Sequence, residues 1–239
     1  MTRSALEAIL VVVPVHDEEA LLPRCLNALS DAIAVVRSTV IDAPAITVKL
    51  VLDACTDASA AIASASEFSV IVADVNNVGE ARACGVALGL QELGDVDPAA
   101  LWISNTDGDS SVPANWLCEQ IEIARRGADV MIGTVRPDFT DLNEAQRDAW
   151  TRTHVPGEAN GHVHGANLGF RASRYLQAGG YPRLPEHEDV QLVAALRSLP
   201  GIIEEATDAC CVLTSGRAVG RTPGGYARYL SDDLIASAG

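Results

Sequence analysis

Lysine is almost absent from this chain of 239 residues, since Lys49 is the only lysine among its 17 basic residues. The basic residues are outnumbered by 32 acidic ones, and the formal net charge is −15. A chain this acidic repels the phosphate backbone of nucleic acids, so we expect no nucleic-acid partner. Any other anionic ligand would need a metal ion or a local cluster of arginines to bind.

Cysteine pairs with the spacing of a metal or redox motif are also lacking. The six cysteines are Cys25, Cys55, Cys84, Cys118, Cys210 and Cys211. No two of them form a CxxC motif, and most lie in apolar or alanine-rich surroundings. This pattern predicts reduced, buried thiols and a cytoplasmic location, not a disulfide framework or a zinc site.

Hydrophobic runs are short throughout the sequence. The run over 9–15 falls well below the roughly 20 apolar residues that span a bilayer. Residues 1–7 lack the apolar core of a signal peptide. We therefore expect no transmembrane segment, and a peripheral contact with a membrane stays open. The length and a hydrophobic content of 48% suit one large globular domain.

Short β-branched runs alternate with segments of helical periodicity over the first 133 residues. The expected strands cover 9–15, 46–52, 68–73, 101–104 and 128–133, and the expected helices cover 20–36, 58–66, 80–93 and 113–126. Strands and helices that alternate in this way predict an α/β fold with a Rossmann-like, mostly parallel sheet covered by helices on both faces.

The second half of the sequence is less regular. Its expected elements are a polar insertion over 134–161 with a helix near 141–150, helices over 172–178, 185–199 and 226–236, one or two strands within 202–213, and a glycine-rich basic loop over 214–225. His162 and His164 alternate, which suits a strand that places both rings on one face. They could ligate a metal, but the sequence offers no clear third ligand.

Polar and mostly acidic residues follow the first, second and fourth expected strands. His16, Asp17 and Glu18 follow the first strand, and Asp53 follows the second. In parallel sheets ligands bind beyond the carboxyl ends of the strands, so these side chains should share one binding edge. A structural alternative exists, because carboxylates such as Glu18 also serve as helix caps.

Asp107 and Asp109 lie in the loop after the fourth strand and are separated by one glycine. Two carboxylates held close together repel each other and raise each other's pKa, and a bound divalent cation removes this repulsion. Mg²⁺ or Mn²⁺ is the expected ion, with open positions left for the phosphate oxygens of a diphosphate. The alternative is a solvated Asp-Gly-Asp turn, since both residue types favour turns.

Taken together, these motifs resemble the family 2 glycosyltransferases with the GT-A fold. The matching segments are 11–19, 51–57, 77–82, 106–109, 165–171 with 179–181, and the Glu188-Asp189 pair. They span about residues 9 to 199 in the order found in the family. The segment over 51–57 departs from the family pattern, because only some of its acids are kept.

The resemblance implies a donor, a cation and an acceptor. The donor would be a UDP- or GDP-linked sugar, the ion would be held by Asp107 and Asp109, and the acceptor would be a hydroxyl group. Residues 1–133 would form the donor-binding half, and 134–239 the acceptor-binding and catalytic half of the same single domain. The expected donor-binding residues are Pro14, His16, Asp17, Glu18, Asp53, Arg82, Asp107, Arg217 and Arg221.

Catalysis is expected at the Glu188-Asp189 pair. By the resemblance, Asp189 would be the catalytic base, with Glu188 raising its pKa through charge repulsion. Attack on the far side of the sugar would invert its anomeric centre, although some enzymes of this fold retain it. The acceptor would contact Gly165, Asn167 and His187. By position alone, the acidic pair could simply complement a helix dipole.

Other interpretations of these residues stay open. Arg217 and Arg221 would either clamp a diphosphate or only solubilise the 214–225 loop. Trp116 and Trp150 are candidate platforms for a sugar ring. The rival functions are a nucleotidyltransferase and a non-catalytic nucleotide-sugar-binding protein. A nucleotidyltransferase usually has a basic, glycine-rich loop after its first strand, whereas residues 14–19 are acidic and contain no glycine. A homo-oligomer is compatible with the sequence.

Overall fold

The structure is a computed structural model that describes residues 5–220 and 224–237. The strands are β1 (Ala8–Val15), β2 (Ala45–Asp53), β3 (Ser69–Ala73), β4 (Leu101–Asn105), β5 (Val130–Pro137), β6 (Leu168–Arg171) and β7 (Glu204–Thr214). The α-helices are α1 (Leu22–Thr39), α2 (Ser59–Ser64), α3 (Val78–Glu92), α4 (Trp116–Arg126), α5 (Glu144–Thr153), α6 (Ala172–Gln177), α7 (Glu188–Arg197), α8 (Tyr226–Arg228) and α9 (Leu234–Ser237). Two 3-10 turns, η1 (Phe139–Asp141) and η2 (Gly165–Asn167), and a π-helical turn, η3 (Tyr229–Asp233), complete the elements.

The seven strands form one sheet in the order β3-β2-β1-β4-β6-β5-β7. All neighbouring pairs are parallel except those of β6, which runs antiparallel to β4 and to β5. This confirms the predicted α/β class with a mostly parallel sheet. Because β6 is reversed, its beginning lies at the edge where β1, β2 and β4 end. That reversal brings residues 165–167 to the edge that carries the acidic residues.

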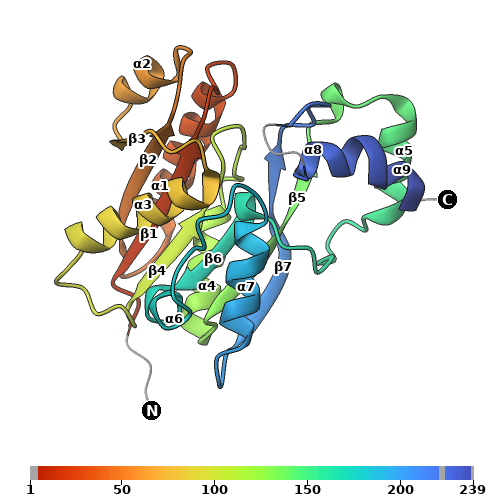
Figure 1. Cartoon of the computed structure of the whole chain (residues 1–239). Helices are drawn as coiled ribbons and strands as arrows, with labels where there is room; N and C mark the ends of the chain where they lie inside the picture. Colours follow the sequence, from red (N-terminus) through yellow and green to blue (C-terminus); the bar gives the residue numbers. More distant parts are fainter. Residues whose placement is uncertain (1–4, 221–223, 238–239) are drawn as a thin grey trace.

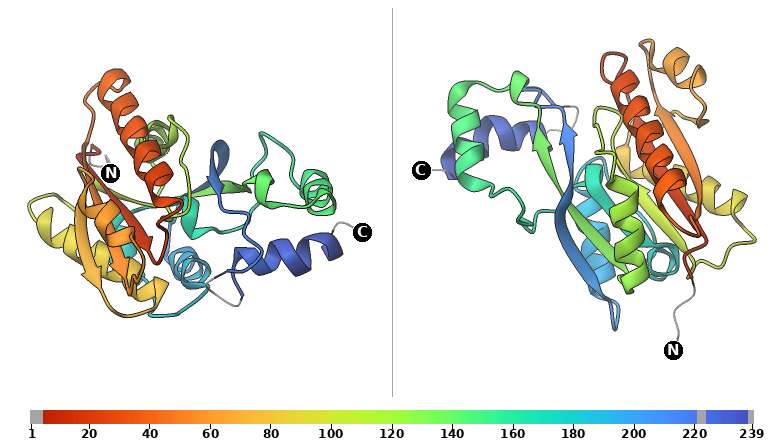
Figure 2. Two further views of the ribbon diagram at one scale, coloured as in Figure 1. Left: turned by 90° about the horizontal axis from the view of Figure 1, so that it is seen from above. Right: turned by 180° about the vertical axis from the view of Figure 1, so that it is seen from behind.

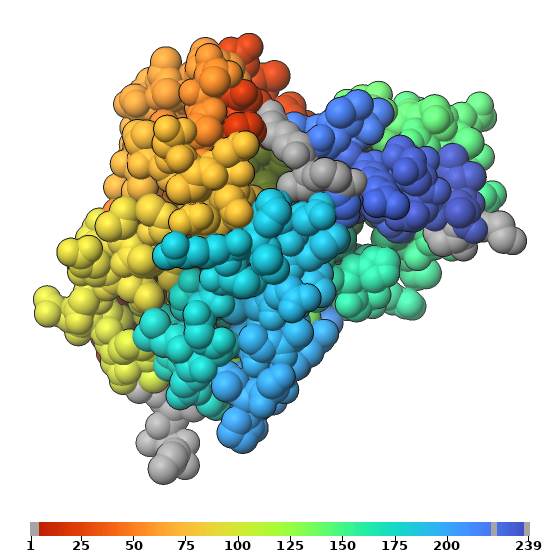
Figure 3. All heavy atoms as spheres, in the orientation of Figure 1, coloured from red at the N-terminus to blue at the C-terminus, as the bar shows by residue number. Residues whose placement is uncertain are grey.

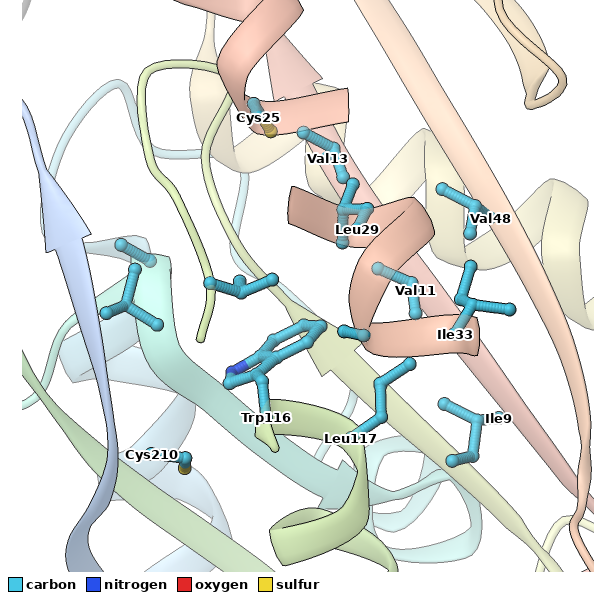
Figure 4. Close-up of a cluster of buried hydrophobic side chains, with 14 of the residues drawn as sticks. Ile9, Val11, Val13, Cys25, Leu29, Ile33, Val48, Trp116, Leu117 and Cys210 are labelled. Carbon is cyan, nitrogen blue, oxygen red and sulfur yellow. The ribbon is translucent and has the colours of Figure 1, made fainter. Parts of the chain in front are cut away.

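Two hydrophobic cores lie on the two faces of the sheet. Ile9, Val11 and Val13 point from β1 toward α1, where Leu29 and Ile33 meet them (Figure 4). Their neighbours Leu10 and Val12 point to the opposite face, which α3, α6 and α7 cover (Figure 1). A strand whose successive side chains are all buried needs cover on both faces, and the continuous apolar run of β1 meets that condition.

A third, smaller core lies at one side of the sheet. Leu142 and Ala149, beside and within α5, pack against Leu230 and Leu234 of the C-terminal helical segment. Both views of Figure 2 place α5 and the C-terminal helices together, outside the layers that cover the sheet. The expected helices over 141–150 and 226–236 are therefore present, and they stabilise each other. Within the described ranges, no helix is both long and apolar enough to cross a bilayer.

The largest departure from the expected elements falls on residues 162–164. His162 and His164 lie in an irregular segment and not in a strand, and β6 begins only at Leu168. The main-chain N–H of the following residue, Gly165, bonds to the side chain of Asp189 instead of to a neighbouring strand. The proposed boundary between a donor-binding half, 1–133, and an acceptor-binding half, 134–239, falls inside β5. The two halves therefore stay a functional proposal and do not correspond to separate structural units.

Candidate active site

The polar residues that follow β1, β2 and β4 converge at one edge of the sheet. The parallel register pairs Val15 of β1 with Leu52 of β2, so both strands end at the same level. The His16 ring joins these ends, because its Nδ1 lies 2.6 Å from the main-chain oxygen of Asp53. Figure 3 shows a depression at this edge, between the red and orange N-terminal segments and the cyan segment that precedes α7.

Asp53 shapes the turn between β3 and α3. Its carboxylate accepts hydrogen bonds from the main-chain N–H groups of Val75, Asn76 and Asn77, at 2.7–2.9 Å. The residue is only 4% exposed. Asn77 then caps α3 by accepting a hydrogen bond from the N–H of Glu80 at 3.0 Å. The contribution of Asp53 to a binding site is therefore to hold this turn against the end of β2.

Asp17 joins the loops that follow β1 and β2. One of its carboxylate oxygens accepts hydrogen bonds from the N–H groups of Thr56 at 2.6 Å and Asp57 at 3.2 Å. These bonds, led by that of Thr56, lower the pKa of Asp17 below its usual value. The residue has a φ of 50°, a left-handed conformation that aspartate adopts more readily than most residues. Asp17 is thus ionised and holds the rim of the edge together.

Hydrogen bonds hold the Asp107-Gly-Asp109 loop against the end of β1 and against α1. The N–H of Gly108 donates to the main-chain oxygen of Pro14 at 3.2 Å, and the Cys25 thiol donates to that of Asp107 at 3.4 Å. A side chain at position 108 would meet Val15 at 3.2 Å, so glycine permits this close approach. The two carboxylates are consequently held at the sheet edge by main-chain contacts.

Arg82 lies buried between the Asp107 loop and the start of α7. Its Nη2 donates to Asp107, and its Nε donates to Glu188 at 3.1 Å. Burial alone would lower the pKa of this guanidinium, but the carboxylates around it raise the pKa well above its usual value. A side chain at Gly165 would come within 2.6 Å of Arg82 Nη2. Arg82 therefore joins β4, η2 and α7, and with an exposed fraction of 2% it acts through Asp107 and Glu188.

Arg217 pairs with the second aspartate of the loop. Its Nη2 donates to both carboxylate oxygens of Glu18 at 2.9 Å and to Asp109 at 2.7 Å. The hydroxyl groups of Ser110 and Thr214 donate hydrogen bonds to the other carboxylate oxygen of Asp109, at 3.0 and 3.4 Å. The basic loop over 214–225 thus reaches the acidic edge through Arg217. Arg221, the second arginine expected there, lies outside the described residues.

Asp189 is the acid nearest to η2. One of its oxygens accepts the N–H of Gly165 at 2.6 Å, and the other accepts the N–H of Val190 at 2.8 Å. Burial raises the pKa of Asp189 and that of its neighbour Glu188 above their usual values. A half-buried carboxylate with a raised pKa is a chemically suitable proton acceptor. Glu188 is 5% exposed and bonded to Arg82, so it positions the start of α7.

Asn167 requires a correction. It was expected to face an acceptor, but it is completely buried and its amide is used within the protein. Its oxygen accepts from the Trp116 indole at 2.9 Å, and its nitrogen donates to the main-chain oxygens of Thr134 and Cys210. Trp116 is equally buried and cannot be a sugar platform. Asn167 ties together β5, β7 and α4, and we leave it out of the acceptor site.

His187 keeps a position at the site. It immediately precedes α7 in a left-handed conformation with φ of 60°, and its side chain is exposed. A side chain at Gly224 would come within 3.0 Å of the His187 ring, so the C-terminal segment closes against this loop. His187 therefore lies beside the acid pair, as the sequence predicts.

The donor set fits a cation that is bound together with a ligand. In the described part of the chain, no three His, Cys, Asp or Glu side chains lie close enough to form a metal cage. Asp109, with Asp107 beside it, provides hard carboxylate oxygens at an open edge. Mg²⁺ sites of this kind use one or two carboxylates and complete the coordination with water and substrate phosphates. Arg217 bonds to the Asp109 carboxylate, so it would compete with such a cation for Asp109.

Six side-chain rings form a group beside Gly165, of which the sequence indicates Trp150, His162 and His164 but not their association with the other three. This ring row consists of Trp150, His154, His162, His164, Tyr226 and Tyr229. The Trp150 and His154 rings stack at 4.2 Å between centroids, and the remaining neighbours lie 5.5–6.4 Å apart. These residues come from segments 62 residues or more apart, Trp150–His164 and Tyr226–Tyr229, so no local spacing pattern could reveal the group.

Several solved structures share the fold of this chain. Its fold resembles that of Staphylococcus aureus TarS 1–349, with 13% identity, a TM-score of 0.57, and coverage of 97% of this chain and 65% of that one. The chain thus spans less than two thirds of that protein's length. The mannosyltransferase PcManGT from Pyrobaculum calidifontis, solved with GDP-Man and Mn²⁺, gives 16% identity, a TM-score of 0.59, and coverage of 89% and 58%.

A third similar structure is glucosyl-3-phosphoglycerate synthase of Mycobacterium tuberculosis with Mg²⁺ and UDP. It gives 16% identity, a TM-score of 0.54, and coverage of 97% of this chain and 78% of that one. These likenesses identify the GT-A fold. No curated protein sequence matches the chain. The model of glycosyl transferase family 2, however, matches residues 10–175, well over half of the sequence. The chain therefore belongs to glycosyl transferase family 2.

Proposed function

We propose that this protein transfers a sugar from a nucleoside diphosphate sugar to an acceptor hydroxyl group. The observation that carries the proposal is the joining of two acidic positions by one buried arginine. Arg82 bonds to Asp107 on the donor side and to Glu188 on the acceptor side. A transferase needs a leaving-group site and a proton acceptor at a fixed separation. Asp107 is two residues from Asp109, which would face the diphosphate, and Glu188 precedes Asp189, the proposed base, so the Arg82 contacts would help to fix that separation.

The donor would lie over the carboxyl ends of β1, β2 and β4. The nucleoside would rest against Pro14, His16 and the turn held by Asp53, and its diphosphate would face Asp109. A divalent cation bound there would stabilise, as a Lewis acid, the charge on the departing diphosphate. Arg217 would leave Asp109 and bind phosphate oxygens, for which its planar guanidinium is well suited. The related structures with UDP and Mg²⁺, or with GDP-Man and Mn²⁺, support this arrangement.

The acceptor would approach from the side of η2 and α7. Asp189 would accept the proton of the attacking hydroxyl, and its raised pKa suits that role. The N–H of Gly165 holds the Asp189 carboxylate in orientation. Attack from the face opposite to the diphosphate would invert the anomeric centre. The cytoplasmic location remains a prediction, which the six free cysteines support, and the homo-oligomer remains untested.

The donor site is tested by thermal unfolding with UDP and GDP, each with and without Mn²⁺. A nucleotide that binds only the native protein raises the melting temperature by mass action. We expect this rise to require Mn²⁺ and to be lost in Asp109→Asn. Asp95→Asn, an exposed aspartate far from the edge, is the matched control and should behave like the wild type. An equal rise in Asp109→Asn would remove the cation site from the proposal.

The base is tested by Asp189→Asn. The amide keeps the shape of the side chain but cannot accept the proton, so transfer should fall by about 10²- to 10⁴-fold. Nucleotide affinity, measured by calorimetry, should stay unchanged because Asp189 lies on the acceptor side. Transfer at the wild-type rate would mean that another group is the base.

A further inference from the structure

The ring row lies directly beside the proposed base. His164 precedes Gly165, whose N–H bonds to Asp189 at 2.6 Å. We propose that the ring row is the acceptor subsite and that it binds a neutral sugar, so that the enzyme extends a carbohydrate. This inference rests on the proposed function and adds the chemical class of the acceptor.

The rings leave part of their surfaces open. His162 is exposed, and Trp150, His154, His164, Tyr226 and Tyr229 are half-buried. Aromatic residues of this kind combine an apolar face with a polar tip. The tips of Trp150 and Tyr226 are buried, so the polar atoms would come from the histidines and Tyr229. A sugar ring has the complementary pattern, because its C–H groups pack on a flat ring while its hydroxyl groups bond to nitrogen and oxygen atoms at the rim.

Two contacts fix the ring row relative to the base. On one side, η2 connects His164 to Gly165 and thereby to Asp189. On the other side, the N–H of Gly224 donates to Glu186 at 2.7 Å, which anchors the segment leading to Tyr226 at the loop before α7. The two chain segments that form the row are thus both attached to the surroundings of Asp189. A sugar bound on the row would present a hydroxyl group near that carboxylate.

The charge of the row favours a neutral ligand. Burial lowers the pKa of His154, and it lowers that of His164 to about 4, so both rings are neutral near pH 7. The charges that act on these two rings come from neighbouring histidines and from Asp208. A phosphate or carboxylate ligand is bound best by arginine, through planar charge-assisted hydrogen bonds. Neutral imidazoles and phenols instead exchange hydrogen bonds with hydroxyl groups.

The first experiment uses tryptophan fluorescence. Trp102 and Trp116 are completely buried, so Trp150 is the tryptophan that a ligand on the row would contact. The probes are the methyl α- and β-glycosides of glucose, mannose, galactose and N-acetylglucosamine, titrated with and without UDP or GDP and Mn²⁺. We expect at least one glycoside to change the emission with saturation. The same glycoside should shift the ring NMR signals of His154, His162 and His164 but not those of His16.

The second experiment uses variants of the row. His162→Ala removes an exposed ring, and we expect it to raise the half-saturation concentration of that glycoside about tenfold, as loss of one ring contact of about 1.4 kcal/mol would. UDP or GDP affinity with Mn²⁺ should be unchanged. Arg152→Ala, an exposed change at the end of α5, is the control and should leave glycoside binding as in the wild type.

Two results would overturn the inference. One is that no glycoside changes the Trp150 emission under either condition. The other is that 3-phosphoglycerate or vesicles containing a polyprenyl phosphate produce the change and the glycosides do not. The nucleotide titrations report separately on the proposed function. If UDP and GDP both fail to bind while a glycoside binds the row, the donor assignment is wrong and the sugar subsite stands.

Discussion

Two arginines pair with four of the acidic side chains at the sheet edge. Arg82 pairs with Asp107 and Glu188, and Arg217 pairs with Glu18 and Asp109. Removing one partner from a buried ion pair typically costs about 3–5 kcal/mol, because the remaining charge is left without compensation. These pairs therefore fix carboxylates that would otherwise repel one another. Asp189 differs from them, since its carboxylate bonds mainly to main-chain N–H groups.

The surroundings of Asp189 predict the acid limb of the pH profile. Burial raises its pKa, so the carboxylate becomes protonated at a higher pH than an ordinary aspartate. A base works only when deprotonated, and kcat/KM should therefore fall with decreasing pH at a midpoint above the usual aspartate pKa of about 3.9. Initial rates of transfer across the pH range measure this midpoint. The assignment of Asp189 as the base would be contradicted if the acid limb had its midpoint at the ordinary aspartate pKa while nucleotide affinity did not change with pH.

At the scale of elements, the N-terminus of α3 and the loop before α7 touch main chain to main chain. The N–H of Gly79 donates to the main-chain oxygen of Leu184 at 3.3 Å. A side chain at position 79 would lie 2.6 Å from that oxygen and from the oxygen of Pro182. Glycine at the first turn of α3 therefore permits this contact, which sets where α7 and its acid pair begin.

Gly79→Ala is expected to shift the loop before α7. The clashing atoms are main-chain oxygens, so the loop has to move, and overpacking of this kind usually costs about 1–3 kcal/mol. We expect a lower urea midpoint and a lower kcat, with little change in the KM of the donor. Gly94→Ala is the control, because that glycine is exposed and its added carbon would meet one oxygen at 3.3 Å. Equal effects in both variants would argue against a specific contact.

At the scale of the whole molecule, a chain with net charge −15 would have to bind an anionic donor through local positive charges. Long-range repulsion between the protein and a nucleoside diphosphate slows their encounter, while Arg217 and a cation act only at short range. Dissolved salt screens the long-range part first, because the Debye length falls from about 30 Å at 0.01 M to about 8 Å at 0.15 M.

The association rate of UDP or GDP should therefore rise with ionic strength over this range. Stopped-flow fluorescence at fixed Mn²⁺ measures the rate, and the uncharged nucleoside serves as the control, with a rate that salt should not change. An association rate that falls with salt would mean that the local arginines dominate the field that the nucleotide meets.

The sequence alone determined the layers of the fold and the acidic edge. Continuous apolar runs such as 9–15 require cover on both faces, and alternation with helical segments then leads to a mostly parallel sheet. Parallel strands end at the same edge of a sheet, so the residues after β1, β2 and β4 could be placed together without knowing the strand order. Asp53, Asp107 and Asp109 could be assigned to that edge because each ends or directly follows a strand.

Only the tertiary structure decided which polar groups face inward and which distant segments meet. Asn167 and Asp53 carry polar side chains that resemble ligand contacts in sequence, yet both satisfy hydrogen bonds of the protein itself. The pairing of Arg217 with Glu18, 199 positions apart, leaves no local spacing to detect. The ring row likewise joins residues from α5, α8, η3 and the segment between α5 and β6. Local sequence patterns record periodicity along a chain, whereas these contacts depend on the packing of segments that are remote in sequence.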